Sequence, residues 1–207
     1  MSDSILSLKD KHRGQTLHVV GKGTSLHHLN PSHFGEGPVI TINEAIQVVQ
    51  EFNLPNDVYS MQKDGCDGWN VGNLCQGACE MHVPMVRPSD ERITVILQRP
   101  GYSQDCLPDY PNKLYMTPTA DFNGILYDSE MSVVLCVELG RQVMGCSQVV
   151  LLCFDSFAGN FTTYGGQTDE QLARNHAYYG YAVQRLHHIF DAHAYPHTIV
   201  IPEKEEA

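Results

Sequence analysis

The chain has 207 residues, 42% of them hydrophobic, and its 24 acidic against 13 basic side chains give a formal net charge of −11. A chain of this length can bury a full core, so a disulfide-stapled miniprotein and a disordered tail are both excluded. The acidic balance disfavours a nucleic-acid partner, because backbone binding needs a surface rich in Lys and Arg. We expect one folded domain over 1–207.

Cysteine usage and hydropathy indicate the cellular compartment. Seven cysteines are an odd number for a disulfide framework, and the chain is large for such a scaffold. No apolar segment of export length follows Met1, and no stretch approaches the ~18 consecutive apolar residues of a membrane span. The sequence predicts a protein of the reducing cytoplasm without a transmembrane segment, and it leaves open whether the chain forms a homo-oligomer.

Short apolar runs alternate with helical patterns along the first half of the chain. Strands are expected at 17–20, 39–42, 58–61 and 93–97. A short helical turn at 24–29, with Thr24-Ser25 as its cap, and a helical repeat over 45–52 lie between the first three strands. This alternation is typical of a parallel sheet with helices on both faces.

The rhythm breaks over 63–88, where glycines and three cysteines stand among polar residues. We expect a long irregular excursion there, and such loops in compact domains are often functional. Regular patterns return as a helix over 131–144, a strand over 149–154, a long amphipathic helix around 179–190 and a last strand near 198–201. The predicted fold is a Rossmann-like α/β domain with a mostly parallel sheet.

The first predicted strand runs into Gly21-Lys22-Gly23-Thr24-Ser25. Glycines let a backbone approach an anion closely, and the following helical turn would point free N–H groups toward it. Lys22 and Ser25 would add a charge and a hydroxyl. The pattern is neither a complete G-x-G-x-x-G nor a phosphate loop, so a tight turn without a ligand is the alternative interpretation.

Polar residues follow two other predicted strands. Asn43 ends the second strand and Asp155 ends the strand after the 131–144 helix. Ligands of open parallel sheets lie outside the carboxyl ends of the strands, which would place both residues over a site. The alternative interpretations are that Asn43 caps the next helix and that Asp155 caps a turn.

Three of these features together resemble a known group of proteins. The group begins with Gly-Asn-Gly-Pro-Ser-Leu, has an Asn after the second strand, and carries a Ser/Thr-led helix, a Gly and an apolar strand that ends in Asp. Gly21–Leu26, Ile42-Asn43 and the stretch 129–155 match this order. The chain thus resembles the small bacterial sialyltransferases and the related motility accessory factors and archaeal pterin diphosphokinase-like proteins.

The resemblance implies a Rossmann-like glycosyltransferase that moves a sugar, such as a sialic-acid-like one, from a CMP- or UDP-type nucleotide sugar to a hydroxyl acceptor. Its expected nucleotide contacts are Gly21, Lys22, Gly23, Thr24, Ser25, Asn43, Ser129 and Ser132. The catalytic base of the sialyltransferases corresponds to His176, for which a capping or surface role is the alternative. Lys22 and Thr24 depart from the Asn and Pro of the group, which leaves the donor unidentified.

The residues are compatible with that chemistry. The ordinary pKa of imidazole, ~6.5, suits removal of a proton from a sugar hydroxyl. Tyr164 can supply a phenol donor to the negatively charged leaving nucleotide, and Asp155 completes the catalytic candidates. Because no Asp-x-Asp pair follows a strand, we expect a metal-independent transfer that requires no cofactor.

Two other functions stay open at this stage. One is a pterin-type diphosphokinase that uses a nucleoside triphosphate and magnesium, with Asp64, Asp67 and Asp155 as its carboxylates. The other is a non-catalytic nucleotide-binding protein of the same fold.

A metal site is a separate hypothesis for the excursion. Soft thiolates and an imidazole can form a tetrahedral zinc site, for which the candidates are Cys66, Cys75, Cys79 and His82. Their irregular spacing favours buried free thiols instead, the state that we also expect for Cys136 and Cys153.

Overall fold

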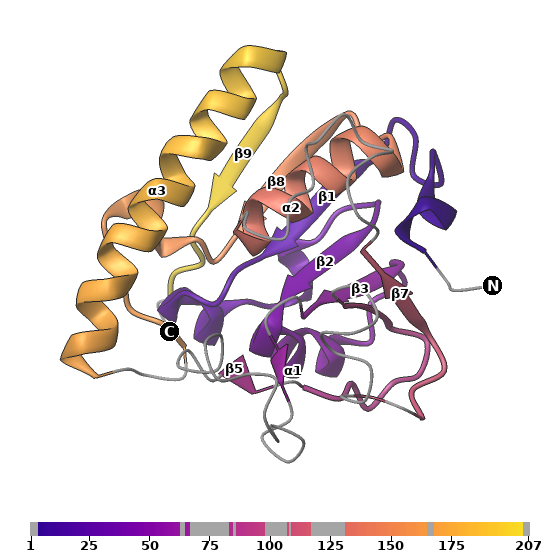
Figure 1. Cartoon of the computed structure of the whole chain (residues 1–207), viewed down its shortest axis with the longest axis horizontal. Coiled ribbons are helices and arrows are strands. Elements are labelled where there is room, and N and C mark those ends of the chain that lie inside the picture. Colours follow the sequence, from indigo (N-terminus) through magenta and orange to yellow (C-terminus); the bar gives the residue numbers. More distant parts are fainter. Residues whose placement is uncertain are drawn as a thin grey trace.

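The computed structural model of the chain describes residues 4–62, 65–66, 83–84, 86–97, 107, 109–116, 131–164 and 168–204. Its centre is a seven-stranded sheet (Figure 1). In chain order the strands are β1 (Thr16–Val20), β2 (Val39–Ile42), β3 (Val58–Met61), β6 (Thr94–Leu97), β7 (Lys113–Tyr115), β8 (Gln148–Leu152) and β9 (His197–Val200). Every neighbouring pair is parallel, which confirms the predicted α/β, Rossmann-like fold class.

Helices cover both faces of the sheet. One face carries the 3₁₀ turn Ile5–Leu8, α2 (Ser132–Glu138) with its π-helical continuation Leu139–Met144, and α3 (Asp169–His193). The other face carries the 3₁₀ turn Thr24–His28 and α1 (Ile46–Val49). Successive side chains of a strand point to opposite faces of the sheet, so alternate residues of one strand pack against the helices of the two faces.

Strand β1 illustrates this division. Leu17 and Val19 pack in the cluster beneath α2 and α3, and Val20 packs in the cluster beneath α1. All three side chains are buried. Burial on both faces is what a central parallel strand requires, and it explains the continuous apolar run in the sequence.

The helical stretches differ more from the predictions than the strands do. The 45–52 repeat is α1 between two single 3₁₀ turns, Asn43–Ala45 and Gln50–Phe52. The last helix begins at Asp169, ten positions before the predicted start, because its first turns are exposed and carry no apolar repeat. Three of the described strands had no prediction, namely β7 and the small parallel pair of β4 (Gly65–Cys66) with β5 (Val83–Pro84).

The strand order places a switch point between β1 and β8. From β1 the chain adds strands outward to β7 and then returns to the other side of β1 with β8 and β9. In open α/β sheets the crevice for a ligand lies at the carboxyl ends of the strands at such a reversal. The turn after β1 and the segment after β8 meet there.

Helix α3 extends beyond this edge of the sheet. Its 25 residues span ~37 Å, whereas the four residues of β9 span ~13 Å. Because α3 precedes β9, its N-terminal half projects past the carboxyl ends of the strands (Figure 1).

Within the described ranges, no helix combines the length and hydropathy of a membrane span.

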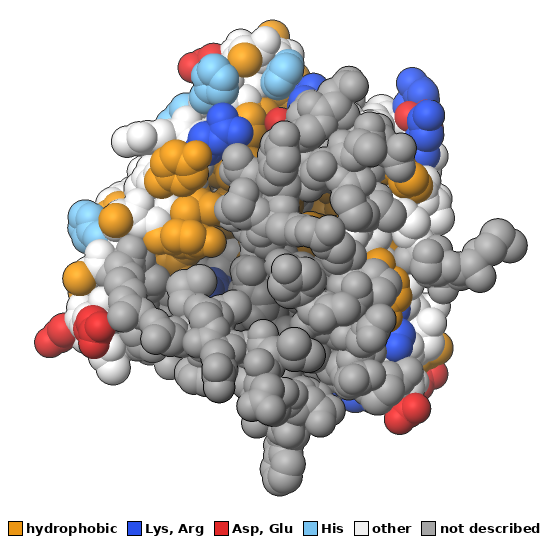
Figure 2. Space-filling model, in the orientation of Figure 1, with side chains coloured by type: hydrophobic (Ala, Val, Ile, Leu, Met, Phe, Trp, Pro, Cys, Tyr) orange, Lys and Arg blue, Asp and Glu red, His pale blue; other side chains and the backbone are white. Residues whose placement is uncertain are grey.

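Hydrophobic and His side chains lie exposed on the α3 side of the molecule (Figure 2). Tyr178 and Tyr181 are the large hydrophobic residues exposed there, at 40% and 51%. Four histidines on or after α3 are exposed as well: His187, His188, His193 and His197.

Candidate functional site

Two loops are in direct backbone contact at the switch point. The amides of Gly21 and Gly23 donate to the carbonyls of Leu152 and Cys153, at 2.8 and 3.0 Å. A Cβ atom on Gly23 would lie 2.5 Å from the Asp155 carboxyl carbon and 2.7 Å from the Cys153 carbonyl. The glycines of the turn therefore have a packing reason, since only a residue without a Cβ fits against the 153–155 segment.

The carboxylate of Asp155 lies at the start of the 3₁₀ turn Thr24–His28. Its Oδ2 accepts from the Ser25 amide at 2.8 Å and from the Thr24 hydroxyl at 3.0 Å, and its Oδ1 accepts from the Ser25 hydroxyl. Gly23, and not Thr24 or Ser25, is the N-cap of the turn. This corrects the expected geometry, because the Asp155 carboxylate accepts the hydrogen bonds at the start of the turn that were expected to bind an external anion.

Asp155 itself is 4% exposed. Its donors come from the turn after β1, and it follows β8, so it joins the two halves of the sheet across the switch point. We assign it a positioning role, as in the turn-capping alternative, and we do not count it among the groups that would touch a substrate.

Asn43 is the unusual residue of this edge. It directly follows β2, is 6% exposed, and has a φ of 50°. It is the first residue of the 3₁₀ turn Asn43–Ala45, whose N-cap is Ile42, and α1 has Ala45 as its N-cap, so the capping alternative for Asn43 is wrong. Its Oδ1 is buried and has no hydrogen-bond partner in the part of the chain that the structure describes. A buried acceptor without a partner is costly, so it calls for an explanation such as a ligand.

Two of the five described non-glycine residues with a positive φ lie around the same place. Cys153, which directly follows β8, has a φ of 62°, and Asn43 follows β2, the other neighbour of β1. A non-glycine residue in the left-handed region costs roughly 1–3 kcal/mol and is often found at functional sites. The two strained positions flank the Gly21–Ser25 turn on both sides.

Lys22 is not directed at solvent in this arrangement. Its ammonium lies 3.0 Å from Oε1 of Glu44, and the two side chains are only 20% and 19% exposed. The other carboxylate oxygen, Oε2, is buried without a hydrogen-bond partner among the described residues. The pair joins the carboxyl ends of β1 and β2, and Glu44 is a site residue that the sequence analysis did not identify.

A third segment, 160–164, crosses the glycine turn. The Tyr164 amide donates to the Lys22 carbonyl at 2.7 Å, and Thr163 forms an antiparallel bridge with Gly23. The Tyr164 ring lies against the His27 ring, with 4.4 Å between their centroids. Tyr164 is therefore brought to the turn, as the catalytic prediction requires.

His176 reaches the same region through this segment. It lies in the exposed N-terminal half of α3, and its ring packs on Phe161 with 4.0 Å between the centroids. Because residues 161–164 lead directly onto the glycine turn, the imidazole is on the carboxyl side of the sheet. An exposed imidazole that packs on Phe161 is compatible with a base and also with a surface role.

The remaining candidates have mixed outcomes. Ser132 is the first residue of α2 and is buried. The chain runs from α2 into the start of β8, which lies at the amino edge of the sheet. The first residue of α2, Ser132, therefore lies at the carboxyl edge, where Asn43 also lies. Ser129, Asp64, Asp67, Cys75, Cys79 and His82 lie outside the described residues, and of Cys66 only the backbone is described.

Two of the cysteine predictions are confirmed. Cys136 and Cys153 are buried free thiols. Burial raises the pKa of Cys153 to about 12, so this thiol stays protonated at neutral pH. Within the described ranges, no three His, Cys, Asp or Glu side chains are grouped as a metal site would need. The zinc hypothesis for the excursion stays a prediction.

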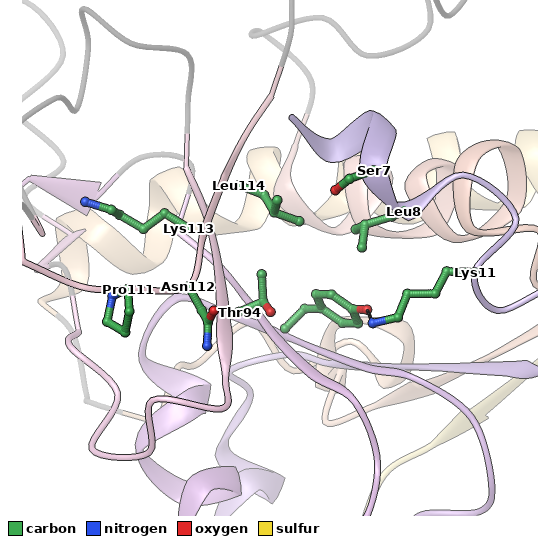
Figure 3. Close-up of a pocket in the computed structure, with 9 residues that line it drawn as sticks. Ser7, Leu8, Lys11, Thr94, Pro111, Asn112, Lys113 and Leu114 are labelled. Carbon is green, nitrogen blue, oxygen red and sulfur yellow. Dashed lines mark hydrogen bonds between the residues drawn. The ribbon is translucent and has the colours of Figure 1, made fainter. Parts of the chain in front are cut away.

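A cavity of about 420 Å³ lies at the opposite edge, where β3, β6 and β7 begin (Figure 3). In Figure 3 the Lys113 side chain points away from Lys11. The Tyr59 hydroxyl accepts a hydrogen bond from the Lys11 ammonium at 3.1 Å and shares another with Nε2 of His12 at 2.9 Å. This network attaches the N-terminal segment to the sheet, and its members are too far apart in sequence for any local pattern to indicate it.

Comparisons of the chain with protein-family models and with curated proteins find no match. The family resemblance thus rests on the motifs alone. The described site offers two acceptor oxygens beside the switch point, on Asn43 and Glu44, with an imidazole on the adjoining helix. It can accept hydrogen bonds from a polar ligand and, at the imidazole, a proton from a hydroxyl.

Proposed function

We propose that the protein is a nucleotide-dependent glycosyltransferase, which moves a sugar from a CMP- or UDP-type donor to a hydroxyl acceptor without a metal ion. The observation that carries the proposal is Asn43, a strained residue with a buried, unpartnered oxygen among the described residues. It lies beside the switch point, where open α/β sheets bind their ligands.

The reaction would use His176 as the general base. Its imidazole takes the proton of the acceptor hydroxyl while the hydroxyl oxygen forms a bond to the anomeric carbon of the sugar. The bond between that carbon and the phosphate oxygen breaks, and the nucleotide leaves with the bonding electrons. Tyr164, held at the glycine turn by its amide, is the candidate donor to the negative charge of the leaving group.

The position of Asp155 affects how a phosphate can bind. Because this carboxylate already accepts from Thr24 and Ser25, a phosphate at the turn would have to approach from the side of Lys22 and the 160–164 segment. The same engagement makes Asp155 a poor ligand for magnesium, so the diphosphokinase is not favoured by any described contact.

A ligand screen tests the binding step. We expect CMP or UMP, without magnesium, to raise the melting temperature of the full chain, because a ligand at 100 times its Kd adds ~2.7 kcal/mol to stability. Stabilisation only by a nucleoside triphosphate with magnesium would instead support the diphosphokinase. If no nucleotide changes the melting temperature, the proposal is wrong.

The base is tested separately by His176→Ala. We expect this variant to bind the nucleotide as the parent does and to transfer sugar at least ~10²-fold more slowly, the usual effect of removing a general base. The matched control is His188→Ala, which removes another exposed imidazole from α3. Unchanged turnover in the His176 variant would exclude this residue from the mechanism.

A further inference from the structure

The carboxylate of Glu44 has one occupied and one unoccupied oxygen. Oε1 receives the Lys22 ammonium at 3.0 Å, and Oε2 is buried with no partner among the residues described. The Lys22 ammonium compensates the charge of the carboxylate in a place that is largely shielded from water. Among the described residues, Oε2 has no hydrogen-bond donor.

A second acceptor lies next to it in the chain. The Asn43 side chain is more than nine-tenths buried, and its Oδ1 also has no donor within the described part of the chain. Two neighbouring acceptors need a ligand that offers two donors. A metal ion fits this place poorly, because the Lys22 ammonium already lies on the carboxylate. A phosphate fits it poorly too, because the negative charge of the Glu44 carboxylate would repel it.

The position of Glu44 in the fold indicates which donors these are. It lies just beyond β2, beside the strand that carries the glycine turn, and 21 positions after Gly23. In dinucleotide-binding α/β folds an acidic residue about 20 positions after the glycine turn accepts a hydrogen bond from a ribose hydroxyl. A vicinal diol supplies two O–H donors, which is the number that the two acceptors need.

Three neighbours define the surroundings of Glu44. The Lys22 ammonium is its ion-pair partner, and Asn43 is its neighbour in the chain. Burial, and after it the negative charge of Glu44, raise the pKa of Tyr179 on α3 to about 12. Lys22 acts as a positioning residue, because it holds one oxygen and leaves the other for the ligand.

We propose that Glu44 and Asn43 bind the 2′- and 3′-hydroxyls of the ribose of the nucleotide, so that this site selects ribonucleotides over deoxyribonucleotides. The inference rests on the proposed function, since it assumes a nucleotide at the switch point. The diol of the transferred sugar has the same chemistry, and nucleoside monophosphates without a sugar distinguish the two sources.

The test is calorimetric titration of the full chain with CMP and UMP and with their 2′-deoxy and 3′-deoxy analogues. Each deoxy analogue would leave one buried acceptor unpaired, so we expect it to bind the parent protein at least about tenfold more weakly. In Glu44→Gln, the ribonucleotide should lose affinity by about tenfold and the preference for ribose should shrink to within about threefold.

Two controls keep the outcomes separate. Glu51→Gln changes an exposed carboxylate in the segment after α1 and should keep the full preference, and melting temperatures verify that both variants are folded. If the parent binds ribo- and deoxyribonucleotides equally, or Glu44→Gln keeps the preference, the ribose inference is overturned while the proposed function stands. If no nucleotide binds at all, both are overturned.

Discussion

Single residues at the switch point are determined by contacts within the chain. Gly23 lacks a side chain because Asp155 and Cys153 leave no room for one, and Cys153 adopts a left-handed backbone that few residues other than glycine or Asn adopt readily. Asn43 differs from these two, since its side-chain oxygen has no partner among the described residues. Packing explains the glycine at position 23, whereas for Asn43 we propose a ligand as the missing partner.

Gly23→Ala tests the packing explanation. The added methyl would lie 2.5 Å from the Asp155 carboxyl carbon, so we expect a loss of ~1–3 kcal/mol in the free energy of unfolding, the usual cost of overpacking. Gly180→Ala is the control, because a Cβ there meets nothing within 4 Å and the residue is inside α3. Helix propensity predicts that the control gains ~0.5–1 kcal/mol, and urea unfolding measures both variants. Equal stability of Gly23→Ala and the parent would contradict the close contact.

At the scale of elements, the sheet is held together at its carboxyl edge by side chains as well as by strand pairing. Asp155 connects the segment after β8 to the turn after β1, and Lys22 and Glu44 connect that turn to the end of β2. The 160–164 segment adds a backbone link to the same turn. These links hold the proposed ligand-binding edge in one arrangement.

Asp155→Ala should disrupt this arrangement. The substitution leaves the Ser25 amide and the hydroxyls of Thr24 and Ser25 without their acceptor. We expect a loss of roughly 2–4 kcal/mol, because each buried donor left unpaired costs ~1–3 kcal/mol, whereas the half-buried Thr24 hydroxyl can bind water instead. Asp155→Asn retains an acceptor oxygen and should lose less than the Ala variant.

Denaturant midpoints of these two variants are compared with that of Asp191→Ala, which removes an exposed carboxylate from α3. The control should unfold as the parent does. Parent-like stability of Asp155→Ala would show that the carboxylate does not join the two loops.

Strands were easier to predict from the sequence than helices, for a physical reason. β2 and β3 are short buried runs bounded by Pro, Gly or Asn, and their predicted limits agree with the structure. The start of α3 was placed too late, because residues such as Ala173 and Ala177 are exposed and leave no apolar stripe. β7 has only one buried residue, Leu114, and three residues carry no recognisable alternation.

The candidate site was predictable in position and not in detail. The end of β2 pointed to Asn43 as a residue over the sheet edge, because polar residues that follow parallel strands gather there. Lys22 and its ion-pair partner Glu44 are 22 positions apart in the chain. Ser25 and the Asp155 carboxylate that accepts its hydrogen bond are 130 positions apart. Such contacts depend on strand order, which no local pattern reports.

At the scale of the whole molecule, a buried histidine makes the stability depend on pH. The chain has 11 His residues, and one of them, His18, is buried in the central strand β1 with 3% exposure. Its Nε2 accepts a hydrogen bond from the Gly35 amide at 3.1 Å. Protonation of that nitrogen would remove the acceptor and place a charge in the core.

Burial lowers the pKa of His18 below its ordinary value of 6.5. The unfolded chain therefore binds a proton at this residue more readily than the folded protein does. The contribution to stability is fully present above about pH 6.5 and is lost as the pH falls through the lower folded pKa. Stability measured by urea unfolding should decline from pH 7 to pH 5.

His18→Gln removes the titrating group and keeps a side chain that can accept from Gly35. We expect this variant to decline less steeply over the same pH range, although its stability at pH 7 is lower because the side chain is not matched to the core. His188→Ala, on the solvent face of α3, should decline as the parent does. Parallel pH profiles for His18→Gln and the parent would exclude His18 as the source.

The pairing of β1 with β8 also constrains how the chain can fold during synthesis. The two strands are central neighbours, yet paired residues are 132 positions apart in the chain. Until the ribosome has released residue 152, the edge of β1 that pairs with β8 is free. Its apolar side chains, such as Val19 and Val20, which the folded protein buries, lack their β8 neighbours until then. Long-range parallel pairing of this kind is slow, and unpaired apolar edges promote aggregation. The nascent chain therefore has most need of a chaperone while its middle third is being translated.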